Sequence, residues 1–144
     1  MIRTFLINKY LGVEFFKVVI NASIIFFSAG FVINLFEEIN FFKEIDVSIK
    51  VPLILSMLFT PSLLHKFFPF IILLSGIWFF LKIKKSDELT AINISGLSNL
   101  FVIFTPGIIS IILGIFFITA FNPITSLLVK KYETIKGAYE IDQE

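Results

Sequence analysis

The feature that most constrains this chain is the length of its uncharged runs. No Asp, Glu, Lys or Arg occurs from Leu89 to Val129, and the run from Val18 to Phe36 is equally free of charge. A helix needs about 20 mostly apolar residues to cross the roughly 30 Å of hydrocarbon in a bilayer. Both runs are long enough, and a soluble domain of this size could not hide so much apolar surface from water. We therefore expect an integral membrane protein.

Composition supports this class and argues against several functions. Of the 144 residues, 57% are hydrophobic and 16% are charged, whereas a soluble domain usually carries about 25% charged residues. A net charge of +1 gives no field that would attract nucleic acid, so no nucleic-acid partner is expected. The chain has no cysteine, which rules out disulfides and thiolate metal sites.

The pattern predicts an all-α fold with three transmembrane helices. The first span is expected at about residues 10–36, the second at 62–82 and the third at 98–129. Apolar residues recur at helical spacing from Ile2 to Phe16, with polar residues between them. This spacing predicts an amphipathic helix at the membrane interface before the first span, although an ordinary solvated helix start fits nearly as well. Glu14 and Lys17 are three residues apart, close enough to pair on one face of that helix.

Prolines and a glycine predict where these elements end. Pro61 is expected to end a short surface helix before the second span, because proline lacks a backbone donor. Pro123 is expected at the far end of the third span, and the polar tail from Lys130 to Glu144 is expected to form neither a fourth span nor a folded unit. A short helix over 86–95 should join the second and third spans and end at Gly96, since glycine accepts the left-handed cap conformation.

Basic residues decide the orientation only weakly. With three spans, they divide evenly, with Arg3, Lys9, Lys17, Lys82, Lys84 and Lys85 on one side and Lys43, Lys50, Lys66, Lys130, Lys131 and Lys136 on the other. The densest cluster is in the loop at 82–85, and lysine-rich short loops favour the cytoplasmic side. This places the N-terminus inside the cell.

The sequence offers little material for catalysis. The only histidine, His65, is followed by Lys66 and is otherwise flanked by apolar side chains, so an enzyme centred on it is the weakest hypothesis. We expect no catalytic residue, no metal site and no cofactor. A phosphate-binding loop of the form GxxxxGK(S/T) is also missing, so a nucleotide would have to be bound by a partner.

The segment from Lys82 to Ser98, KIKKSDELTAINISGLS, holds more information than a membrane anchor needs. Asp87 and Glu88 fall in the first turn of its expected helix, where the exposed amides favour acids. Two interpretations stand at this point. The segment is a well-capped connector, or it is a rigid surface helix that displays a carboxylate to a basic groove in another protein.

The same segment resembles the loop between the second and third spans of the LptF/LptG permease family, paired membrane subunits of the lipopolysaccharide-export ABC transporter. Its matching residues are Ser86, Glu88, Leu89, Ser95, Gly96, Leu97 and Ser98, with Asp87 as an extra acid. Further similarities occur in the same order along the chain, at Asn8-Lys9-Tyr10-Leu11, Pro61, Phe67-Phe68-Pro69, Pro106 and Asn122-Pro123.

The resemblance implies a role for each of these regions. The short helix would be a cytoplasmic coupling helix that docks into a groove of an ABC ATPase dimer, through Glu88 and the surrounding Ser86, Asp87, Leu89 and Gly96. Lipid acyl chains would contact apolar side chains of the substrate path. That path includes Phe26, Phe27, Phe31 and Phe67, and Lys43 is the first base beyond the first span.

The resemblance also implies partners and a location. They are a second permease subunit, lipopolysaccharide, periplasmic bridge components and membrane lipids, in the bacterial inner membrane. The subunit would be non-catalytic. Family members continue into a periplasmic β-jellyroll and three more spans, so we expect a chain truncated at Glu144. LptF-like and LptG-like identities both stay open, with the Phe67-Phe68-Pro69 run closer to LptG.

An alternative from another class is a self-contained three-span structural or assembly protein. Gly107, Ser110 and Gly114 form a small-residue face at helical spacing, which suits close contact with a partner helix.

Overall fold

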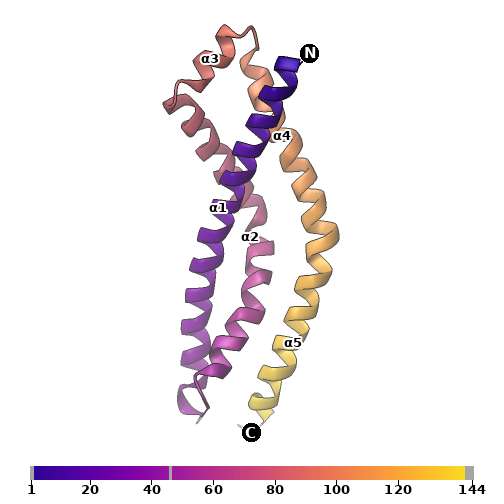
Figure 1. Cartoon of the computed structure of the whole chain (residues 1–144). Coiled ribbons are helices and arrows are strands. Elements are labelled where there is room, and N and C mark those ends of the chain that lie inside the picture. The colour runs from indigo at the N-terminus through magenta and orange to yellow at the C-terminus, as the bar shows by residue number, and fades with distance from the viewer. Residues whose placement is uncertain (1, 46, 142–144) are drawn as a thin grey trace. The chain divides into compact units, whose positions relative to one another are not determined.

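The computed structural model describes residues 2–45 and 47–141, and Glu144, where the sequence ends, lies outside them. Within this part the chain is helical and contains no strand (Figure 1). The elements in order are α1 (Ile2–Phe41), the 3-10 helix η1 (Phe42–Glu44), α2 (Lys50–Lys85), α3 (Glu88–Ile94), α4 (Asn99–Phe116), the π-helix η2 (Phe117–Phe121) and α5 (Asn122–Ile141).

Three helical stretches are long and apolar enough to cross a membrane. They are Thr4–Glu44, Lys50–Lys85 and Asn99–Tyr139. The all-α membrane class with three such helices is therefore confirmed, and the short helix expected between the second and third is present as α3.

The first helix differs from the expectation at its start. The interfacial helix expected before the first span is not a separate element, because α1 is continuous from Ile2 to Phe41. No proline occurs in this stretch, so nothing removes a backbone donor between the amphipathic segment and the apolar run.

The second helix also differs, because Pro61 does not end a helix. Helix α2 continues through Pro61 and Pro69 to Lys85. The hydroxyls of Thr60 and Ser62 donate to backbone carbonyls in the turns around Pro61, to Ser56 O at 2.6 Å and to Phe59 O at 2.8 Å. The carbonyl that loses its helical donor at Pro61 is that of Met57, so these bonds stabilise the adjacent turns and do not replace the missing one.

The third helix extends further than the sequence indicated. Pro123 is the second residue of α5, not the end of a span. The π-helix η2 directly precedes Pro123, and local π-helical adjustments are one means by which membrane helices tolerate proline. Residues 130–141, expected to belong to a polar tail outside any folded unit, therefore form the second half of α5.

The contacts divide the chain into two compact units. Unit 1 consists of Met1–Ser23 and Pro69–Phe116, and unit 2 of Ile24–Phe68 and Phe117–Glu144. The main buried cluster belongs to unit 1 and joins four helices through Leu11, Phe15, Val18, Val19, Phe79, Ile83, Ile92 and Val102. Unit 2 buries polar side chains among its helices, including Asn34, Glu38, Ser56, Thr60 and Thr125.

Candidate functional site

The candidate site is the connection from α2 through α3 to α4, in unit 1 (Figure 1). Helix α2 ends with Lys82, Lys84 and Lys85 in its last turn, where cations interact favourably with the helix dipole. The Ser86 hydroxyl donates to Lys82 O at 3.0 Å. Ser86 therefore completes the end of α2, and the helix expected over 86–95 is shorter, at 88–94.

Asp87 forms the turn between α2 and α3. Its backbone is left-handed, with φ of 57°, a conformation that aspartate tolerates better than most residues. The Asp87 carbonyl accepts from Ala91 N at 3.2 Å, while its side chain makes no cap hydrogen bond and is exposed. Asp87 thus turns the chain and leaves its carboxylate in solvent.

Gly96 ends α3 in the manner that the sequence predicted. Its φ is 83°, which is left-handed and strained for any residue with a Cβ. Gly96 N donates to Asn93 O at 3.0 Å and Leu97 N to Ile92 O at 3.4 Å. These two bonds form a Schellman motif, which satisfies carbonyls at the end of the helix.

One face of α3 is fixed to the body of unit 1. Ile92 belongs to the buried cluster, and Leu89 and Leu97 pack against it. Leu89, which was expected to contact a partner, is half-buried and packs against this chain's own buried cluster. The large apolar side chain that α3 exposes is that of Ile94, which is 82% exposed. The sequence analysis did not single it out. Helical spacing separates the two residues, because Ile94 lies two positions after Ile92 and side chains two apart in a helix point to different faces.

Helix α1 contributes two side chains to this site. The Tyr10 hydroxyl lies close to the half-buried Glu88 carboxylate and interacts with it electrostatically. The Glu14 carboxylate binds Lys17 Nζ at 2.7 Å and Lys82 Nζ at 2.6 Å. Helical spacing predicted the pair with Lys17, whereas Lys82 lies too far along the chain for any local pattern to indicate it.

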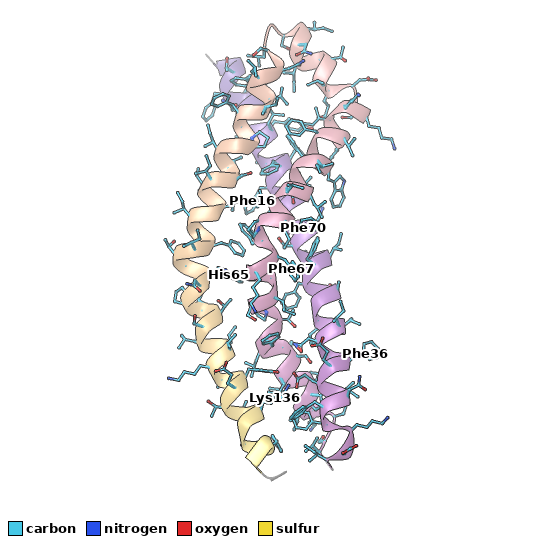
Figure 2. The ribbon with its side chains drawn as sticks, turned by 180° about the vertical axis from the view of Figure 1, so that it is seen from behind. Phe16, Phe36, His65, Phe67, Phe70 and Lys136 are labelled. Atoms are coloured by element: carbon cyan, nitrogen blue, oxygen red, sulfur yellow. The ribbon has the colours of Figure 1, made fainter. Side chains whose placement is uncertain are left out.

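The residues expected on a substrate path all lie in unit 2. Phe67 and Lys43 are exposed, and Phe27 is just exposed. Phe26 and Phe31 are half-buried on α1. Figure 2 shows Phe67 on α2. The structure thus groups these residues within one unit, and it groups the five predicted coupling residues within the other.

His65 lies in an aromatic environment. Its ring stacks with those of Phe117 and Phe121, at centroid distances of 6.5 and 6.4 Å. Its Nδ1 atom is buried without a hydrogen-bond partner, and no carboxylate pairs with the ring in the described part of the chain. Residues 2–45 and 47–141 also contain no group of three side chains suited to hold a metal ion.

A buried polar cluster in unit 2 was missed by sequence reasoning. Glu38 on α1 is 2% exposed, and its Oε1 accepts from Tyr132 Oη at 2.7 Å and Lys136 Nζ at 3.0 Å. Lys136 also donates to Tyr132 Oη at 2.8 Å and lies 4.3 Å from the centre of the Phe41 ring. The cluster joins α1 to the half of α5 that was expected to lie outside any folded unit.

Comparison with known proteins gives one match. Residues 9–142 match the sequence model of a family described as the lipopolysaccharide export system permease LptF/LptG. No curated protein and no solved structure matches the chain.

Proposed function

This chain belongs to the LptF/LptG family of lipopolysaccharide export permeases, and we propose that it couples lipopolysaccharide extraction to ATP hydrolysis in a partner protein. The lipid would leave a bacterial inner membrane for export to the outer membrane. The permease would bind and release lipid, and an ABC ATPase dimer on the cytoplasmic side would hydrolyse the nucleotide.

The observation that carries this proposal is the way α3 is fixed. A helix that transmits force between two proteins must not shift within its own protein. Helix α3 is held by the left-handed turn at Asp87, the Schellman motif at Gly96 and the burial of Ile92. Glu88, at its first position, would offer a carboxylate to a basic residue of the ATPase, and such charge-assisted bonds are among the strongest in proteins.

A second permease subunit of the same family is the partner proposed within the membrane. The small-residue face of α4 suits it, because a Cβ placed on Gly107 or Gly114 would meet no atom within 4 Å. Ser110, between them, donates to its own helix at Pro106 O, 2.8 Å away, and so presents little unsatisfied polarity. Close approach of a partner helix is favoured by such surfaces.

The proposal is tested by Glu88→Ala in the complete transporter. Association with the ATPase should weaken about 10-fold or more, because a hydrogen bond to a charged group contributes roughly 1.5–3 kcal/mol. Lipopolysaccharide export should fall with it, while membrane insertion stays normal. Co-purification of the ATPase and export of labelled lipid in vesicles would measure the two effects.

The matched control is Glu37→Ala, which removes the same group from an exposed position in unit 2. It should leave association with the ATPase unchanged. Normal association and normal export in the Glu88 variant would refute the role assigned to Glu88.

A further inference from the structure

A groove with a volume of about 550 Å³ lies between α2 and α5, within unit 2. Figure 2 shows His65, which forms part of its wall, on α2. Helix α2 contributes Ser62, His65 and Lys66, and α5 contributes Asn122, Thr125, Ser126, Val129, Lys130 and Glu133.

The groove carries two lysines without a counter-ion. Neither Lys66 nor Lys130 forms an ion pair within 4 Å among the residues that the structure describes. Lys66 Nζ lies 5.9 Å from the centre of the Phe59 ring, and the side chains of both lysines are exposed. Glu133 is the one acid among the lining residues. The lining charges therefore favour an anion.

Uncharged polar groups lie beside the lysines. The hydroxyls of Ser62 and Thr125 donate to their own helices, at 2.8 and 2.9 Å, so they offer only lone pairs to the groove. The Asn122 amide and the Ser126 hydroxyl are the neutral donors on α5. On α2, His65 Nδ1 is buried and unpartnered, and in the tautomer that carries the proton there it is a further donor.

The lysines are within reach of the lipid headgroups. Lys66 lies between the uncharged runs 51–65 and 67–81 of α2, and Lys130 immediately follows the uncharged run 89–129. Lysines at the ends of apolar runs extend toward the membrane surface, where phosphates lie. Two helices thus bring to one groove a lysine that borders an apolar run.

From these observations we propose that the groove binds the phosphate of an anionic phospholipid from the surrounding bilayer. The lysines pair with the phosphate, and Asn122 and Ser126 donate to its free oxygens. Basic pockets between transmembrane helices commonly bind such headgroups. A bilayer phospholipid fits because the wall at His65 stacks on Phe117 and Phe121, rings that suit a glycerol backbone and acyl chains.

The test is binding of phosphatidylglycerol to the purified full chain in a zwitterionic detergent, measured by native mass spectrometry. Lys66→Gln combined with Lys130→Gln should weaken binding about 30-fold, because each lysine near a membrane surface contributes roughly fivefold. The matched control is Lys131→Gln, which removes an exposed lysine next to Lys130 that does not line the groove. It should change binding less than 2-fold, because a surface substitution outside the groove has only a small effect.

Glu133→Gln should change the affinity for phosphatidylglycerol in the opposite direction. It removes the only acid of the groove and should tighten binding of phosphatidylglycerol several-fold. Unchanged affinity in both the lysine and the Glu133 variants would overturn the proposal, as would an equal loss in Lys131→Gln.

Two further probes identify the source of the phosphate. Phosphatidylcholine should bind weakly to the original chain and be insensitive to the lysine variants. If lipopolysaccharide binding, and not phosphatidylglycerol binding, depends on Lys66 and Lys130, the groove belongs to the transported lipid and the proposal of a resident phospholipid is wrong. Because none of these measurements uses the ATPase, the result is independent of the coupling role of Glu88.

Discussion

Among single residues, Glu38 has the most demanding environment. Its carboxylate is almost fully buried, with Oε1 bound to Tyr132 and Lys136 and Oε2 without a partner. Lys136→Met should therefore leave an uncompensated buried charge, which costs about 3–5 kcal/mol. Chemical unfolding in detergent micelles would measure this loss. Lys131→Met, at an exposed position, should cost less than about 0.5 kcal/mol. Equal stability of the two variants would show that the Glu38 cluster does not hold α1 to α5.

The contrast between two acids shows which residue pairs could be predicted from the sequence. Glu14 and Lys17 are three residues apart, so helical spacing alone predicted their pair. Glu38 pairs with Lys136, which lies 98 residues away. No periodicity indicates which helices will be neighbours at that distance, and the polar composition after Val129 suggested a tail without partners. Long-range pairs of this kind require the fold.

For individual elements, Gly96 carries the most specific prediction. Gly96→Ala should destabilise the end of α3 by about 1–2 kcal/mol, because φ of 83° brings a Cβ too close to the following carbonyl. Amide hydrogen exchange at Ile92 to Leu97 should accelerate about tenfold relative to α4. Gly137→Ala is the control of opposite sign, because Gly137 lies inside α5 with free space for a Cβ. It should stabilise α5 by about 0.5–1 kcal/mol. Protection in α3 that survives Gly96→Ala would mean that the Schellman motif does not fix this helix.

The helices themselves were largely predictable, and their ends were not. Uncharged runs indicated the three long helices, because a bilayer requires length and apolarity and little else. The cap at Gly96 was predictable because a left-handed residue is a local property. The prediction that Pro61 and Pro123 mark the ends of elements was wrong, because the effect of proline depends on its surroundings. Helix α2 continues through Pro61, and the π-helix η2 directly precedes Pro123; in membrane helices, packing and local adjustments of this kind compensate for the missing donor.

For the whole molecule, the orientation in the membrane determines whether the proposed function is possible. The basic residues divide evenly between the two sides, so charge alone gives only a slight preference. Helix α2 is the most direct constraint, because it is continuous from Lys50 to Lys85 and long and apolar enough to span a bilayer. If it does so, η1 and α3, which flank it in sequence, lie on opposite faces of the membrane. The proposed docking of an ATPase requires α3 on the cytoplasmic face.

Single cysteines can test this arrangement cleanly, because the chain contains none of its own. Glu44→Cys and Ser86→Cys place an exposed thiol on either side of α2. A membrane-impermeant maleimide should label Glu44→Cys in intact spheroplasts and Ser86→Cys only after the membrane is opened, with labelling of both in detergent as the control for reactivity. The reverse pattern would place α3 outside the cytoplasm and refute ATPase docking, while three spans would remain. Labelling of both sites from one side would mean that α2 does not cross the membrane, and the expected topology itself would fail.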